Sequence, residues 1–356
     1  MKYKVTNIIL PVLIVVSMWI CCDYVNTIST SIQNGVSVCL NSIVPSMYAF
    51  MILSDLLVKT NSYKLIGRVL SPISRYVLHL DGNMFAIFLI SLVAGYPVGA
   101  KLISNLELNN SIDSTLAKKM YCYCYSGGLA FILGTIGGSL KISLIVYVSN
   151  VMANLILAMI LNFKDTIPKR DTSKTDAKIS SSILIDAINS SFRTIVNICV
   201  MIIAFSIVIS LLDAFNITNT LAIILSKVLK ISSSSIQTVI NAILEVSKSA
   251  NVIVVGSSYL PILSMIFSFG GICVVMQILS ISGKSFNLGY FLKCRLFTAS
   301  ISYIICKWLS SIFLNYEISV NYIRSTQVTK ETSIIPSICL LCMSFILLSK
   351  NTRHIS

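Results

Sequence analysis

Apolar residues follow one another along most of this chain in long runs, and polar residues are concentrated in the short intervals between the runs. A run of about 20 apolar residues is the length that an α-helix needs to cross the hydrocarbon core of a bilayer. The pattern therefore predicts an all-α polytopic membrane protein. The expected spans are residues 5–22, 36–58, 142–163, 195–212, 260–281, 286–314 and 334–349.

Residues that interrupt helices divide several of the apolar runs. A Gly-Tyr-Pro-Val-Gly sequence lies within residues 84–104, and Gly-Gly pairs occur at residues 127–128 and 270–271. Irregular backbone at membrane depth persists only where other parts of the protein or a polar cavity satisfy its N–H and C=O groups. We therefore expect the breaks to form a binding site, with close helix packing through the glycines as the alternative.

Composition and charge agree with a membrane protein. Of the 356 residues, 55% are hydrophobic and only 11% are charged, and the mean hydropathy is +0.86. So few charged residues cannot cover the surface of a soluble domain. The formal net charge of +14 would suggest nucleic acid in a soluble protein, but here Lys and Arg lie mostly in short loops between apolar runs, as in cytoplasmic loops. The expected environment is a lipid bilayer, and no nucleic-acid partner is expected.

The polar segment at residues 164–180 is the clearest linker, and it divides the membrane part in two. The expected organisation is an N-terminal transmembrane anchor at 1–32, a first repeat at 33–163, this cytoplasmic linker, a second repeat at 181–314, and a C-terminal transmembrane helix with a tail at 315–356. No small-residue cleavage site follows the first apolar run, which favours an uncleaved span over a signal peptide.

The two halves resemble each other in five successive elements: a span, an amphipathic basic helix, a broken segment, a Gly-Gly segment and a final span. The Gly-Gly pairs align with each other, as do Asn41 and Asn197, and the amphipathic helices are expected at residues 63–80 and 220–231. Positive charge places the interval after residue 58 and the linker on the same, inner side. An odd number of apolar segments lies between them, so the Gly-Gly segment is expected to be re-entrant. The repeats are then inverted, which is the architecture of secondary transporters.

At this point the chain resembles the Gate-domain (nucleoside recognition) membrane proteins, and among them the sporulation integral membrane protein branch. The segments that carry the resemblance are residues 41–46 (NSIVPS), 54–57 (SDLL), 95–101 (GYPVGAK), 126–129 (SGGL), 268–271 (SFGG) and 277–280 (QILS). The resemblance implies a core similar to that of concentrative nucleoside transporters. It also implies transport of dipicolinate across the outer forespore membrane, from the mother cell towards the spore. Residues 124–128 depart from the family pattern, which has a Ser-Gly-Pro preceded by Asn.

Dipicolinate is a small aromatic dianion, so its site needs positive charge or free N–H donors. Lys101 directly follows the first break, and it is expected either to bind substrate or to extend its ammonium to the membrane interface. Asn241, Glu245, Lys248 and Asn251 recur on one helical face in the second half and are expected to line a cavity. Glu245 is also a candidate carrier of a coupling proton or cation. The alternative is that Glu245 and Lys248 simply neutralise each other.

The candidate substrate-binding residues combine the breaks with these polar side chains. They are Gly95, Tyr96, Pro97, Gly99, Lys101, Ser126, Gly127, Gly128, Glu245, Lys248, Asn251, Gly270, Gly271 and Gln277. Gln277 is expected to hydrogen-bond substrate or to hold its hairpin. Arg193, Lys293 and Arg295 lie near the ends of spans and are expected to anchor them at the interface.

Neither an enzyme nor a metal or cofactor site is expected. His79 and His354 lie outside the main spans, and no catalytic set or phosphate-binding loop is visible. Most of the 11 cysteines lie within apolar runs, where Cys behaves as a small hydrophobe. The function expected first is export of dipicolinate towards the forespore. The alternatives are a nucleoside or other small-molecule or ion transporter, and a non-transporting component of a spore-maturation complex. Formation of a homo-oligomer is left as an open alternative.

Overall fold

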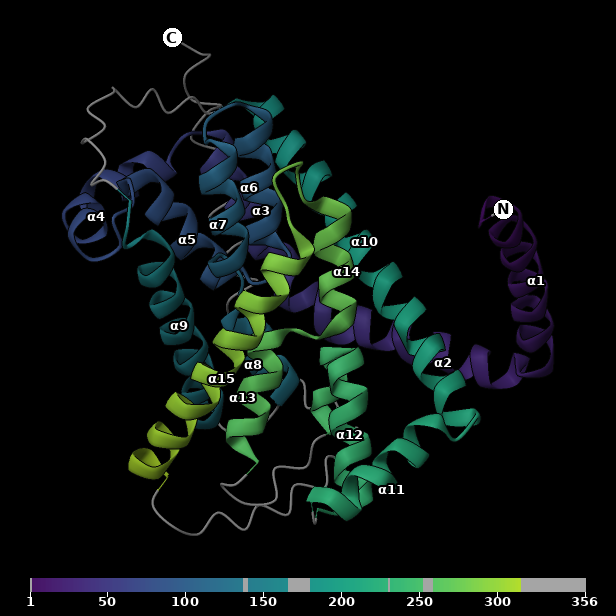
Figure 1. Cartoon of the computed structure of the whole chain (residues 1–356). Helices are drawn as coiled ribbons and strands as arrows, with labels where there is room; N and C mark the ends of the chain where they lie inside the picture. Colours follow the sequence, from purple (N-terminus) through teal and green to yellow (C-terminus); the bar gives the residue numbers. More distant parts are fainter. Residues whose placement is uncertain (1, 137–139, 166–179, 230, 252–258, 315–356) are drawn as a thin grey trace.

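The computed structural model describes residues 2–136, 140–165, 180–229, 231–251 and 259–314, and every regular element in these ranges is a helix (Figure 1). Within them, five helical segments are long and apolar enough to cross a membrane, or six if one bent pair of helices counts as a span. The prediction of an all-α polytopic membrane protein is therefore confirmed. The last expected span and most of the linker lie outside the described residues.

The polar residues between the first two expected spans are helical in the structure. α1 (Lys2–Asp23) is followed directly by α2 (Val25–Val38), which continues through a π-helical turn, η1 (Cys39–Ile43), into α3 (Val44–Lys59). The hydroxyl of Thr30 donates to the carbonyl four residues earlier at 2.9 Å, and that of Ser31 does the same at 2.7 Å. The polar interval is thus part of a helix of 35 residues.

Six further helices complete the first half. They are α4 (Tyr63–Val77), α5 (Gly82–Ala94), α6 (Val98–Leu108), α7 (Ser114–Tyr123), α8 (Leu129–Ile136) and α9 (Leu140–Asn162). α4 is the amphipathic helix expected at residues 63–80, and it meets α5 at an angle of 97°. The helix breaks between α5 and α6 and between α7 and α8 occur where the glycines predict them.

The second half, like the first, begins and ends with a long helix and has shorter elements between the two. Its elements are α10 (Ser181–Ala214), α11 (Ile217–Leu229), α12 (Ser233–Leu244), the 3-10 turn η2 (Val246–Asn251), α13 (Leu260–Phe269), α14 (Gly271–Ile281) and α15 (Leu288–Phe313). α13 and α14 are separated at Gly270, whose φ of +83° is accessible to glycine at little cost. Together they form an apolar segment of 22 residues, long enough to cross a membrane. Re-entry of the Gly-Gly hairpins stays a prediction.

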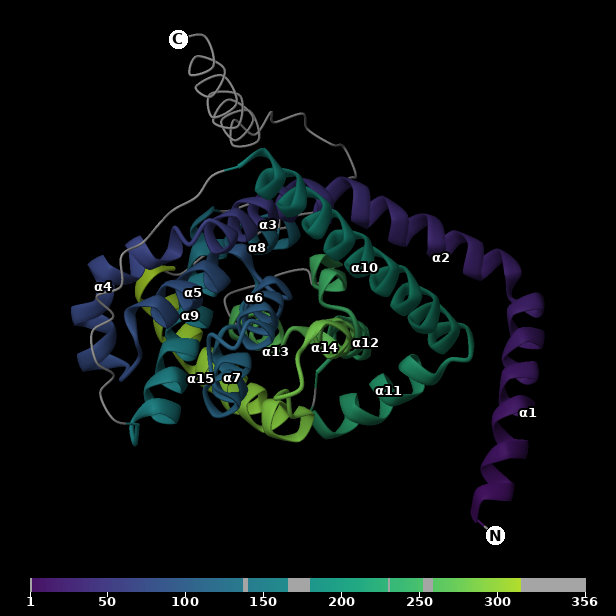
Figure 2. The same cartoon turned by 90° about the horizontal axis from the view of Figure 1, so that it is seen from above.

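The halves pack against each other along α2 and α10, which Figure 2 shows side by side, with α1 extending away from the other helices. The hydroxyls of Ser31 and Ser210 are hydrogen-bonded, and the thiol of Cys39 donates to the carbonyl of Cys199 at 3.8 Å. Residue numbers rise along α2 as those of the contacted residues fall along α10. The first long helix of each half therefore packs antiparallel to the other.

The broken helices occupy the centre of the molecule, and the long helices surround them. Most residues of α5 and α13 are buried. By contrast, large apolar side chains such as Phe192 on α10, and Ile304 and Trp308 on α15, are exposed. An exposed apolar surface of this kind is suited to lipid and not to water.

Candidate functional site

The two breaks of the first half are joined by their backbones. Gly95 has a φ of +83°, and the next residue, Tyr96, donates its backbone N–H to the carbonyl of Ser126 at 2.7 Å. A Cβ on Gly95 would lie 2.6 Å from the backbone nitrogen of Gly128, and one on Gly99 would overlap the carbonyl of Cys124. These glycines therefore permit a close approach of two backbone segments.

The Gly-Gly break of the second half lies against the breaks of the first half. The hydroxyl of Tyr125 donates to the carbonyl of Phe269 at 2.7 Å, immediately before Gly270. A Cβ on Gly271 would lie 3.1 Å from the carbonyl of Ile243, near the end of α12. The sequence-predicted Gly residues of both halves are thus brought together. At these positions neighbouring backbone atoms or a Tyr ring occupy the space that a side chain would need. This arrangement is the one that the alternative of close helix packing through the glycines predicts.

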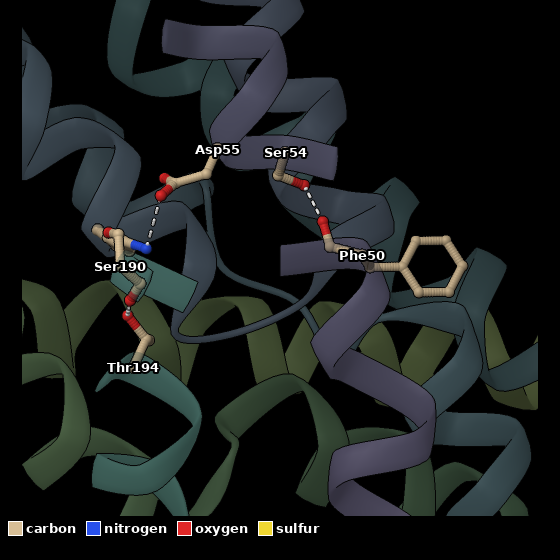
Figure 3. A network of polar contacts seen from close by, with 6 residues as sticks. Phe50, Ser54, Asp55, Ser190 and Thr194 are labelled. Carbon is tan, nitrogen blue, oxygen red and sulfur yellow. Dashed lines mark hydrogen bonds and ion pairs between the residues drawn. The ribbon is translucent and has the colours of Figure 1, made fainter. Parts of the chain in front are cut away.

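Lys101 forms an ion pair with Asp55, and it is not among the residues that line the polar cavity with Lys248. Its ammonium is 3.1 Å from the Asp55 carboxylate, which projects from α3 (Figure 3). The ammonium of Lys101 does not extend to an interface, because the residue is only 9% exposed. Asp55 belongs to one of the segments that carry the family resemblance, yet its partner was not foreseen. An acid within an apolar span was the available signal.

Glu245 is almost fully enclosed, with 1% of its surface exposed. It ends α12, and its carboxylate accepts hydrogen bonds from the backbone N–H of Ser247 at 2.9 Å and from the Ser247 hydroxyl. It forms no ion pair with Lys248 in the part of the chain that the structure describes. Instead, the backbone N–H of Lys248 donates to the Glu245 carbonyl at 3.1 Å. The expected neutralising pair is therefore not formed.

A polar cavity of about 250 Å³ lies between α2, α10, α12 and η2. Its lining combines hydroxyl, amide and charged side chains from both halves of the chain. The lining residues are Ser31, Asn34, Ser206, Ile209, Ser210, Asp213, Gln237, Thr238, Asn241 and Lys248. Of the residues expected on one face of the second broken segment, Asn241 and Lys248 line this cavity.

The polar groups of the cavity differ in how far they are already satisfied. Asp213 accepts hydrogen bonds from the amide of Gln237 at 3.2 Å and from the hydroxyl of Thr218. The side-chain oxygen of Asn241 is buried and has no hydrogen-bond partner among the described residues. The ammonium of Lys248 likewise forms no ion pair there. The cavity thus holds one cation, Lys248, and one carboxylate, Asp213, which form no ion pair with each other in the described structure, beside several neutral polar groups.

The remaining candidates have local contacts. Pro97 follows Tyr96 through a cis peptide bond, and a Cβ on Gly127 would lie 3.3 Å from the Tyr96 hydroxyl. Gln277 is buried and donates to the thiol of Cys273 on its own helix at 3.4 Å, so both roles expected for it stay predictions. The side chain of Asn251 lies outside the described residues.

Arg295 is not an interfacial anchor, contrary to expectation. It is fully buried, and its guanidinium donates to the carbonyls of Cys122 and of Tyr125, the latter at 3.3 Å, and to Asn154 at 2.9 Å. It also lies over the Tyr125 ring, 4.7 Å from the ring centroid. The sequence alone does not show whether an Arg near the end of a span points into the protein or towards the membrane interface. In the structure it holds the C-terminal end of α7 at the first Gly-Gly break. Arg193 and Lys293 are exposed, and their anchoring at the interface stays a prediction.

The chain is similar to the sporulation integral membrane protein YlbJ of Bacillus subtilis (strain 168), with 23% identity over 216 residues. The similar region covers 54% of this chain and 53% of that protein, so the chain spans about half the length of the curated relative it matches. No protein-family model matches the chain, and no solved structure matches it. A Gate domain therefore stays a prediction. The chain is a membrane protein related to a sporulation integral membrane protein.

Proposed function

We propose that this chain is a transporter for a small anionic metabolite, and that its specific activity is export of dipicolinate from the mother cell towards the forespore. The observation that carries the proposal is the unpaired ammonium of Lys248 in a polar cavity between the two halves. A cation at the centre of a bilayer costs at least ~2.5 kcal/mol, so it favours an anionic partner. A bound carboxylate would supply the charge that Lys248 lacks.

The architecture proposed for this activity is a pair of inverted Gate-type repeats in the outer forespore membrane. Three observations support it: a long helix at the beginning and end of each half, the meeting of their breaks, and the antiparallel packing of α2 and α10. Ligand sites between inverted repeats are typical of secondary transporters. The relationship to a sporulation integral membrane protein supports the proposed compartment.

Uptake by purified protein in proteoliposomes tests the proposal. Labelled dipicolinate should accumulate, and a neutral nucleoside of similar size should not. Lys248→Met should abolish dipicolinate uptake because it removes the charge and keeps an apolar stem, whereas Lys248→Arg should retain part of it. Lys227→Met provides a matched control, because Lys227 is an exposed residue of α11, outside the cavity.

A nucleoside transporter is the second candidate function. It is favoured by the neutral hydroxyl and amide groups that make up most of the cavity lining. Uptake of nucleoside in preference to dipicolinate, with little effect of Lys248→Met, would support it and overturn the anion proposal. Failure of the purified protein to take up either solute would favour a non-transporting component of a spore-maturation complex.

A further inference from the structure

We propose that Glu245 binds a proton when an anion occupies the cavity, so that anion and proton bind as a coupled pair. The inference rests on the proposed function and adds a coupling group to it. Its basis is the turn η2, which carries Lys248 on the cavity wall and follows Glu245 in the packed centre.

Glu245 and Lys248 are linked directly through this turn. The backbone N–H of Lys248 donates to the Glu245 carbonyl, and the Ser247 backbone and hydroxyl both donate to the Glu245 carboxylate. The carboxylate itself does not line the cavity. An anion held by Lys248 would therefore not contact Glu245, and it would act on Glu245 through its charge.

The groups that face Glu245 provide little positive charge. Lys248 lies three residues after Glu245 and is the basic residue of the same turn. The break after α5 contributes Tyr96, η1 contributes Cys39 and α14 contributes Cys273, and all three interact electrostatically with Glu245 without supplying a positive charge. α8, α12 and α13, which also pack against η2, carry no ionisable side chain.

Binding of an anion changes this balance. A carboxylate on Lys248 neutralises the cation that favours ionised Glu245, and it brings a like charge near a buried acid. Both effects favour the protonated form. Because linkage is reciprocal, protonation of Glu245 also strengthens anion binding. At full coupling the affinity for the anion falls ~10-fold for each unit of pH increase.

A proton fits this place better than a metal cation. The carboxylate has two hydrogen-bond donors from Ser247 as neighbours, whereas hard cations require six or so oxygen ligands. Within the described residues, no cluster of three or more His, Cys, Asp or Glu side chains could hold a metal ion.

Calorimetry on the full chain in detergent tests the inference. Dipicolinate is titrated into the protein in two buffers of different ionisation enthalpy, at a pH where the probe is fully ionised. The wild type should take up about one proton per bound anion, seen as a buffer-dependent heat. Glu245→Gln should bind the anion without proton uptake and with an affinity that no longer changes with pH. Asp186→Asn, which removes an exposed acid of α10, should behave like the wild type.

The outcomes separate the two proposals. Anion binding by the wild type without proton uptake overturns the role of Glu245 and leaves the proposed function intact. Unchanged proton uptake by Glu245→Gln overturns it as well. Absence of any dipicolinate binding overturns the proposed function and the inference together. If Glu245→Gln does not fold, the buffer dependence of the wild type alone decides, because its absence excludes the coupling.

Discussion

Lys101 and Asp55 form an ion pair of 3.1 Å that joins α6 to α3, and both side chains are largely enclosed. Lys101 lies in the first turns of α6, directly after the first break, and Asp55 lies in the last turns of α3. The pair therefore fixes the helix that follows the break against a long helix of the same half. The ion pair explains why a lysine occurs in an apolar segment, and no bound substrate is needed to explain it.

Removal of one partner of this pair should destabilise the protein. Lys101→Met leaves the Asp55 carboxylate buried without its cation, and breaking a buried pair in this way costs ~3–5 kcal/mol. Asp55→Asn should have an effect of similar size. The double variant should lose less than the sum of the two, because no unpaired charge remains. Thermal unfolding of the detergent-purified protein measures the stability of the three variants. A loss in the double variant equal to the sum of the two single losses would contradict an interaction between Lys101 and Asp55.

The glycines at the breaks should differ sharply in their tolerance of a methyl group. In Gly99→Ala the new Cβ meets the Cys124 carbonyl, which is backbone and cannot move aside easily. Overpacking of this kind costs ~1–3 kcal/mol. Gly134 provides the matched control, because it lies in α8 with no atom within 4 Å of its Cβ position. Gly134→Ala should be neutral or stabilise by up to ~1 kcal/mol. Equal melting temperatures for the two variants would contradict the close backbone approach.

Arg295 should be essential for the stability of the first Gly-Gly break. Arg295→Met leaves the carbonyls of Cys122 and Tyr125 and the amide oxygen of Asn154 without their donor, and each buried unpaired acceptor costs ~1–3 kcal/mol. Arg295→Lys should rescue only part of this loss, since an ammonium lacks the planar fork of donors. Lys293→Met, two residues earlier and exposed, should change stability by less than ~0.5 kcal/mol. Thermal unfolding of the three variants makes the comparison, and equal losses at positions 293 and 295 would exclude the proposed role.

Much of the helical architecture was predictable because it depends on local sequence. Apolar runs of span length and glycines at breaks act through their own backbone, and the helices and breaks were found where those residues predict them. The helix through the polar residues that follow α1 was not foreseen, and the hydroxyls of Thr30 and Ser31 are satisfied within it. Helix ends and loops are the least certain parts of such a prediction.

The cavity could be predicted only in part, because it depends on which helices meet. Asn241 and Lys248 share a helical face, which periodicity reveals, and both line it. Their partners on α2 and α10 are serines and amides without a distinctive spacing. The placement of Lys101 and Arg295 was missed for the same reason. Each charge is satisfied by residues far away in the sequence, and a single sequence does not carry that pairing.

Cross-linking should detect the antiparallel contact between the two halves. The hydroxyls of Ser31 and Ser210 are hydrogen-bonded, so cysteines at these positions should come within the Cβ separation of about 4 Å that a disulfide requires. In a Cys-free background with a protease site in the linker, Ser31→Cys/Ser210→Cys should form a disulfide under mild oxidation. The cleaved halves would then stay together on a non-reducing gel.

Ser31→Cys/Ser190→Cys is the matched control for this cross-link. Position 190 lies 20 residues earlier on α10, about 30 Å along the helix at 1.5 Å per residue. The antiparallel arrangement places it far from α2, so this pair should not form a disulfide. A disulfide in the control pair in place of the Ser31–Ser210 pair would contradict this packing of α2 on α10. Inverted repeats require their equivalent first helices to run in opposite directions, so efficient cross-linking of the control pair alone would remove the packing contact that supports the inverted architecture.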